Sequence, residues 1–189
     1  MSRAYRIRVR ESVTRVVKAH DRVTTQLEVL EILPPEQMGE LLAQELEARG
    51  FEREGNVLVR EQDGITVTVD PAAGTVTVSA ESSEEVALET EQEGRAYDDS
   101  GAHAARVRKD LQEQAKKDLE AQEHRETERL QGKVTDQLEA QLADLRRELD
   151  QAVNRVTAEA LKRKAAQMGQ IKELTEDPES GSLTIVVEV

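Results

Sequence analysis

Histidine is the first residue type to examine for chemistry, because imidazole binds metals and transfers protons near neutral pH. The chain contains three histidines, which are His20, His103 and His124. None stands in an HExxH motif, and no two stand three or four residues apart, the spacing that places two ligands on one helix face. We interpret all three as exposed surface residues and predict no metal site.

The sequence also contains no motif typical of a catalytic nucleophile or of a phosphate-binding loop. Ser180 lies in a Glu-Ser-Gly-Ser stretch, whereas a hydrolase nucleophile typically lies in Gly-x-Ser-x-Gly. Neither G-x-x-x-x-G-K-[ST] nor G-x-G-x-x-G occurs. The acidic pairs at 84–85 and 98–99 lie in segments with little apolar material to raise a pKa, as a catalytic acid requires. We therefore predict no catalytic residue, no cofactor and no enzyme, and keep an unrecognised hydrolase or metal enzyme as a third alternative.

Charge is unevenly distributed along the 189 residues, whose formal net charge is −13. The first 22 residues contain seven basic side chains and two acidic ones, so the remainder carries −18. An acidic body repels phosphate backbones, and we expect no nucleic-acid binding. Arg6, Arg8 and Arg10 are candidate contacts for an acidic protein partner. The alternative is that these arginines form the solvated face of a strand.

The chain is poor in aromatic residues (2%), rich in charged ones (34%) and free of cysteine. Disulfides and thiolate metal sites are therefore excluded, and the core must consist of small aliphatic side chains. No apolar run approaches the roughly 20 residues that span a bilayer, and residues 1–10 lack the apolar stretch of a secretory signal. We expect a cytoplasmic protein without a membrane span.

An antiparallel sheet with one packed helix is expected in the first half of the chain. Apolar residues alternate with arginines over 5–10, which is typical of a strand, and we predict a long hairpin from segments 3–19 and 22–32. A proline pair followed by a glutamate begins a helix at 35–50, which a glycine ends. Three short strands are expected at 56–60, 64–69 and 74–79. Residues 81–99 either continue the last strand or form a linker.

The segment 101–168 is predicted to be helical throughout, because it contains no proline. After its first residue, its only glycine is Gly132. Its apolar residues recur every eleven positions, which is about three helical turns. One face therefore stays apolar along a nearly straight helix. The leucines of this face are candidate coiled-coil contacts, namely Leu119, Leu130, Leu138, Leu142 and Leu149.

Two architectures are compatible with this helical segment. Residues 182–189 alternate as a last strand, and an isolated strand is unstable, so it must pair with a sheet. We favour an antiparallel helical hairpin with its tip within 120–129, which lacks large aliphatic residues, and with arms at 101–119 and 133–153. The alternative is one unbroken helix whose last strand joins the sheet of a second copy.

The predicted fold class is α+β. It consists of a small antiparallel sheet with one packed helix, an inserted helical hairpin (coiled coil), and a C-terminal strand that returns to the sheet. Residues 1–99 would form the sheet domain and 100–153 the coiled-coil insertion. Residues 154–189 would supply the helix and strand that complete the sheet domain.

The C-terminal segment 153–189 carries a family resemblance. Its features are Ala-Leu-Lys in a helix, a closing Gly169, then Ile171, the acidic pair at 176–177 and a final Gly-Ser-Leu-Thr-Ile strand. An earlier helix ends in Gly50-Phe51. These features resemble an accessory-domain family of bacterial FtsH–vWA–MoxR ternary systems, which are encoded beside AAA+ ATPases in conflict or quality-control loci. They are also similar to a conserved reading-frame family of plastids and cyanobacteria. The resemblance supplies no catalytic residues.

The resemblance implies an adaptor that works with an AAA+ ATPase. We therefore hypothesise a non-catalytic, protein-binding adaptor or accessory subunit of an ATPase-containing bacterial assembly in defence or quality control. The alternative is a structural protein whose coiled-coil arms self-associate into a dimer or larger homo-oligomer.

Overall fold

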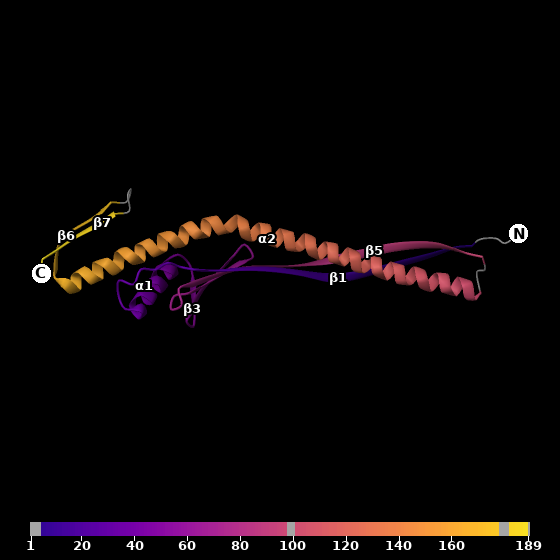
Figure 1. Ribbon diagram of the computed structural model, residues 1–189, viewed down its shortest axis with the longest axis horizontal. Helices are drawn as coiled ribbons and strands as arrows, with labels where there is room; N and C mark the ends of the chain where they lie inside the picture. Colours follow the sequence, from indigo (N-terminus) through magenta and orange to yellow (C-terminus); the bar gives the residue numbers. More distant parts are fainter. Residues whose placement is uncertain (1–4, 98–100, 178–181, 189) are drawn as a thin grey trace. The chain divides into compact units, whose positions relative to one another are not determined.

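The computed structural model describes residues 5–97, 101–177 and 182–188, which form a mixed arrangement of helices and strands (Figure 1). The elements are β1 (Tyr5–Gln26), α1 (Pro35–Ala48), β2 (Glu52–Glu54), β3 (Val57–Gln62), β4 (Ile65–Asp70), β5 (Thr75–Ala96), α2 (Ala102–Met168), β6 (Gln170–Asp177) and β7 (Ser182–Glu188). The predicted α+β class is confirmed, as are the helix at 35–50 and the short strands at 56–60 and 64–69. The strand predicted at 74–79 is the first part of the long strand β5, which continues through the segment 81–96, and β2 was not predicted.

The chain forms two compact units, each built from two separate stretches of sequence. The ribbon unit comprises the described residues of 1–21 and 81–136, and the sheet unit comprises those of 22–80 and 137–189. Strands β1 and β5 and helix α2 each contribute to both units. The division into folding domains at 1–99, 100–153 and 154–189 stays a prediction.

The sheet unit is built on strands in the order β1-β5-β4-β3-β2, with antiparallel pairing through β2, β3, β4 and β5. The register places Leu58, Val69 and Val76 in one cross-strand row, because Leu58 lies opposite Val69 and Val69 opposite Val76. Helix α1 adds Leu42 and Leu46, and all five side chains are at most 1% exposed. The alternation of β4 and β5 therefore gives one covered face, made mainly of valine, on which the leucines of β3 and α1 complete the core.

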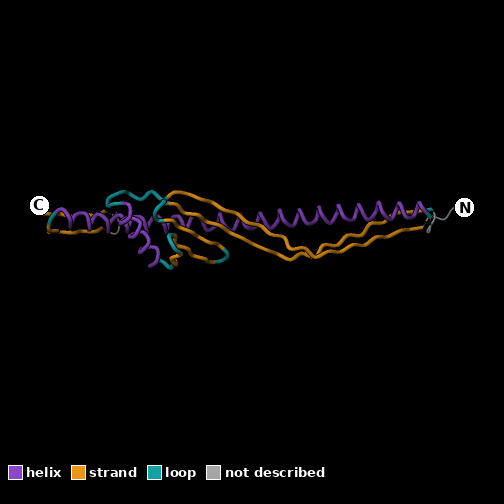
Figure 2. The backbone as a smooth tube through the Cα atoms, turned by 90° about the horizontal axis from the view of Figure 1, so that it is seen from below, coloured by secondary structure: helices purple, strands orange, loops and turns teal. Residues whose placement is uncertain are grey.

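The ribbon unit is an antiparallel pair formed by β1 and the second part of β5, with the first part of α2 on one face (Figure 2). Even-numbered residues of β5 point toward the helix, among them Leu88 and Ala96, which are 5% and 0% exposed. A side chain at Gly94 would lie 3.0–3.1 Å from carbons of Val107 and Leu111, so this glycine lets the helix approach the strand closely. The core of this unit is thin and consists mainly of leucine and alanine.

Helix α2 is continuous over 67 residues, and the predicted helical hairpin is wrong. The stretch 120–129 lacks large aliphatic residues because its inward side chains make polar contacts with the strands instead. Gln122 donates a hydrogen bond to the carbonyl of Glu89 (3.1 Å), and Glu123 pairs with Arg15 (3.5 Å). Most members of the predicted eleven-residue apolar face are buried, namely Leu119, Leu130, Val134, Leu138, Leu145, Leu149, Val156 and Ala160. Leu142 and Val153 are half-buried.

Two strand predictions are also wrong. The segments 3–19 and 22–32 do not form a hairpin, because β1 runs without a turn through His20-Asp21-Arg22 and pairs with β5. The C-terminal strand β7 does not return to the main sheet. It pairs with β6 in a separate two-stranded sheet, and β6 was not predicted. Each wrong prediction paired a strand with the wrong segment, because periodicity locates a strand without showing its neighbour.

Two glycine-to-alanine substitutions should have opposite effects. Gly132 lies inside α2 with no neighbouring atom within 4 Å of an added Cβ, so Gly132→Ala should stabilise the helix by about 0.5–1 kcal/mol. At Gly169 an added Cβ would lie 2.1 Å from the carbonyl oxygen of Glu188, so Gly169→Ala should weaken the β6–β7 sheet. Native-state hydrogen exchange of α2 and β6 measures both. Loss of protection in α2 after Gly132→Ala would contradict a continuous helix.

Candidate interaction surface

The three predicted arginines lie on the exposed face of the ribbon and pair with glutamates of β5. Arg8 contacts Glu91 (Nε–Oε1, 2.9 Å) and Glu93 (Nη2–Oε1, 2.6 Å). Arg10 binds Glu91 (Nη2–Oε2, 2.8 Å), and Arg6 lies 3.7 Å from Glu93. The hydrogen bond from Arg10, with the nearby charge of Arg8, lowers the pKa of Glu91. These arginines stay 53–71% exposed and remain accessible to a partner.

The ribbon leaves further backbone and side-chain surface open. Strand β1 has a single neighbour in the sheet order, and β4 pairs with β5 only over 75–80. Among the described strands, none pairs with the free edge of β1 or with the free edge of β5 over 81–96. The exposed face of β5 is acidic, through Glu81, Glu85, Glu89, Glu91 and Glu93. The ribbon therefore presents a basic strand beside an acidic one, with one open face and two open edges.

Polar contacts hold the opposite face of the ribbon on α2. Glu84 accepts hydrogen bonds from Arg129 (2.5 Å) and Lys133 (3.1 Å), and these contacts lower its pKa. Thr135 donates to Asp21 (2.7 Å). Because these side chains are bound within the unit, they position the ribbon and leave the arginine face outward.

The predicted leucine contacts lie on the inner face of α2. Leu119, Leu130, Leu138 and Leu149 are only 1–8% exposed. Leu142 is half-buried and lines a cavity of the sheet unit together with Val76 and Val78. Their role in partner binding stays a prediction, but the chain's own strands occupy the face that a coiled-coil partner would use.

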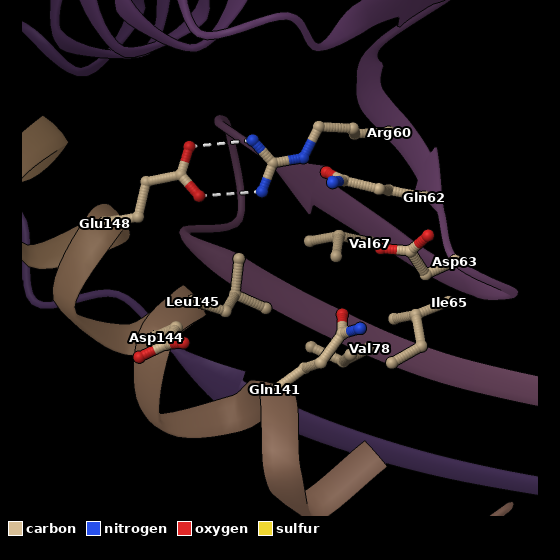
Figure 3. Close-up of a pocket in the computed structure, with 10 residues that line it drawn as sticks. All are labelled: Arg60, Gln62, Asp63, Ile65, Val67, Val78, Gln141, Asp144, Leu145 and Glu148. Carbon is tan, nitrogen blue, oxygen red and sulfur yellow. Dashed lines mark hydrogen bonds and ion pairs between the residues drawn. The ribbon is translucent and has the colours of Figure 1, made fainter. Parts of the chain in front are cut away.

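Arg60 of β3 joins three elements of the sheet unit. Its guanidinium makes two parallel hydrogen bonds with Glu148 of α2, each 2.7 Å long (Figure 3). It also donates to the carbonyl of Arg49 (3.3 Å) at the end of α1 and stacks 4.4 Å from the ring centre of Phe51. Bidentate arginine–carboxylate pairs are directional as well as strong, so this residue holds α1, α2 and the sheet in one arrangement.

This pair borders a cavity of about 290 Å³ in the sheet unit. Its apolar part is lined by Ile65, Val67, Val78 and Leu145, while Gln62, Asp63, Gln141 and Asp144 are polar lining residues (Figure 3). The hydrogen bonds from Arg60 lower the pKa of Glu148, which stays ionised at neutral pH. An ionised carboxylate bound to arginine is a weak general base and no general acid, so the geometry supports a structural role.

The three histidines lie at exposed positions that are far apart in the sequence. His124 pairs with Glu128 (3.3 Å) on the exposed side of α2, and the ring of His103 lies 6.1 Å from that of Tyr97. The described residues contain no cluster of three or more histidine, cysteine, aspartate or glutamate side chains placed to hold a metal ion. Within this part of the chain, neither helix carries an apolar stretch sufficient to cross a membrane.

Sequence reasoning missed the glutamates of β5 as partners of the arginines. A signal was present, because Glu89, Glu91 and Glu93 alternate as Arg6, Arg8 and Arg10 do. Two strands with opposite charges at the same period can form cross-strand ion pairs. The pairing of Arg60 with Glu148 has no comparable signal, because single residues 88 positions apart show no shared period.

The observed architecture is that of an α+β protein in which one long helix contributes both to an open, charged ribbon and to a small sheet. The family model of the FtsH ternary system domain X5 matches residues 1–189. The chain therefore belongs to this family and is an accessory domain of FtsH ternary systems. Comparison with curated proteins gives no match, and comparison with solved structures gives none either.

The lowered pKa of Glu148 predicts an acid-dependent contribution to stability. The pKa of Glu148 is lower in the folded chain than in the unfolded chain. The ionised carboxylate therefore adds to folding stability at any pH above its unfolded pKa, and this stabilisation is lost as the pH falls through the folded pKa. Glu148→Gln should cost on the order of 1 kcal/mol at neutral pH, a value reduced by partial solvent exposure. The difference from the wild type should disappear on acidification. Urea unfolding followed at several pH values checks this, and a constant difference would contradict it.

Proposed function

We propose that the chain is a non-catalytic accessory subunit that binds a protein of an AAA+ ATPase-containing assembly through the ribbon unit. The observation that carries this proposal is the open ribbon, whose outer face and both edges are free of other described strands. Membership in the FtsH ternary-system family supplies the kind of assembly in which such a subunit would act.

The ribbon offers two modes of recognition that reinforce each other. A free strand edge can accept an extended segment of a partner by main-chain hydrogen bonds, which supply affinity. The arginines next to that edge select the partner by charge, since a strand carrying carboxylates would continue the pattern that β5 already makes with Arg8 and Arg10. We therefore expect an acidic, extended partner segment along β1.

The charges of the chain support protein rather than nucleic acid as the partner. A net charge of −13 repels phosphate backbones, which disfavours nucleic acid as the partner. A coiled-coil self-assembly through the leucines of α2 receives less support, because most of these leucines are buried against the chain's own strands. The ribbon is the more accessible surface.

Reversing two ribbon charges should weaken partner binding. Arg8→Glu/Arg10→Glu is expected to lower affinity for the AAA+ ATPase subunit of the same ternary system by roughly tenfold or more, because like charges would face each other at the edge. Purified proteins and biolayer interferometry measure the dissociation constant. Absence of binding by the wild type to every ATPase subunit of the system would overturn the proposed function.

Two controls separate binding from folding. Adding Glu91→Arg/Glu93→Arg to the reversed variant restores the cross-strand ion pairs with opposite polarity, and should restore thermal stability without restoring binding. Arg106→Glu/Lys109→Glu makes the same change in net charge on the exposed side of α2 and should bind like the wild type. Full binding by the reversed variant, or equal loss in the α2 variant, would exclude a specific role for the arginine face.

A further inference from the structure

The two-stranded sheet formed by β6 and β7 lacks the buried side chains that would stabilise it. None of its described side chains is buried, and Leu174 and Val186 are 43% and 44% exposed. An isolated two-stranded hairpin is marginally stable in water, and three or more strands or a packed helix are needed. This sheet therefore has apolar surface that remains to be covered.

The hairpin is nevertheless joined to α2 closely at its root and paired with it near its tip. Gly169 joins α2 to β6 and lies against the backbone of Glu188, where no Cβ would fit. Lys162 of α2 pairs with Glu176 of β6 (3.2 Å), and Lys172 pairs with Glu188 across the sheet (2.7 Å). The hairpin therefore follows directly on the end of α2 in the sheet unit, with one ion pair between them.

The two outer edges of this hairpin differ in a way that selects β7 as the contact strand. Strand β6 contains a bulge between Ile171 and Glu173, and Lys172 is the extra residue. Bulges and lysines are common features of edges that are protected against pairing. Strand β7 has an unbroken register over Ser182–Glu188, contains no proline, and has only β6 as a neighbour among the described strands.

Charge also distinguishes β7 from the other open edges. Its sequence SLTIVVE contains a single charged side chain, although charged residues make up 34% of the whole chain. Two copies of β1 would bring arginines opposite basic residues, and two copies of the acidic part of β5 would bring glutamates together. Two copies of β7 can meet with little repulsion.

We propose that β7 pairs in antiparallel register with β7 of a second copy of the chain, forming a four-stranded sheet in the order β6-β7-β7-β6. A two-fold axis beside Ile185 places this residue opposite its own copy, Leu183 opposite Val187, and Thr184 opposite Val186. The half-buried Leu183, Ile185 and Val187 of both copies then form one continuous apolar face. The contact is isologous, so it closes as a dimer and does not propagate.

This dimer would use a short strand and a small interface, which is typical of weak association. Sedimentation velocity over a concentration series should therefore show a monomer that converts to a dimer as concentration rises. Thr184→Lys/Val186→Lys places like charges of the two copies opposite each other, and should raise the dissociation constant of the dimer at least tenfold. Within one copy, position 186 lies opposite Glu173 of β6, so the second substitution adds an opposite charge there and should leave the hairpin intact.

A matched control keeps the added charge but moves it away from β7. Ser12→Lys/Thr14→Lys adds the same charge to β1 and should leave dimerisation unchanged. A loss of dimer in this control equal to that in Thr184→Lys/Val186→Lys would show that net charge, and not the β7 contact, governs association.

Cysteine substitution tests the register, because the native chain contains no cysteine. Directly opposite residues of an antiparallel pair have Cα atoms about 4.5–5.5 Å apart, within the range a disulfide needs. Ile185→Cys should therefore form a disulfide-linked dimer on oxidation. Thr184→Cys should link much less, since the two copies of that position would lie roughly 8 Å apart.

The outcomes separate this proposal from the proposed function. Arg8→Glu/Arg10→Glu should dimerise like the wild type, because the ribbon takes no part in the β7 contact. A protein that stays monomeric at all concentrations would overturn the dimer. A dimer that persists in Thr184→Lys/Val186→Lys would overturn the assignment to β7, and equal disulfide formation at both cysteine positions would overturn the register.

Discussion

The fold depends on the apolar face of α2, whose side chains are buried in each of the two units. Within each unit, α2 can cover strands over several helical turns only if its apolar side chains stay in line. An eleven-residue repeat meets this requirement, because eleven residues complete about three turns and the next apolar residue returns to nearly the same direction. A seven-residue repeat would instead favour supercoiling with a second helix. The spacing of the apolar residues thus suits packing on strands, and both units use it.

Local elements were easier to predict from the sequence than their partners. Periodicity correctly located the helix at 35–50, the alternating strands and the eleven-residue face of α2, because these signals are local. The predicted hairpin within α2 is wrong because the polar stretch 120–129 forms helix and not a turn. In the structure, Gln122 and Glu123 contact strand groups, so the helix continues without large aliphatic residues there. Arg10 of β1 and its partner Glu91 are 81 positions apart, and only the matching charges of the two strands could have indicated this pairing.

The candidate surface was predicted only in part for the same reason. The alternation of Arg6, Arg8 and Arg10 correctly indicated a strand with one basic face, but it could not show that glutamates of β5 already bind them. Exposed ion pairs of this kind contribute little to stability, because solvent screens them and ordering long side chains costs entropy. They are better suited to setting the register between β1 and β5. If β1 shifted by one residue along β5, every arginine would move to the side of the ribbon that faces α2. The ion pairs therefore keep the arginines on the open face.

Both units have small cores, so a bound partner would change their stability noticeably. With 2% aromatic residues and one covering layer on the ribbon, the chain buries little apolar area per residue. A partner that binds only the folded ribbon would stabilise the ribbon, and the stabilisation grows with the logarithm of the partner concentration. When the partner concentration is a hundred times the dissociation constant, the gain is about 2.7 kcal/mol. That gain is roughly a fifth to a half of the net stability of a small domain, which is typically about 5–15 kcal/mol. If the partner proposed above binds the open strand edges, it would supply a second covering layer to the ribbon. The same contact would also protect those edges from unintended pairing.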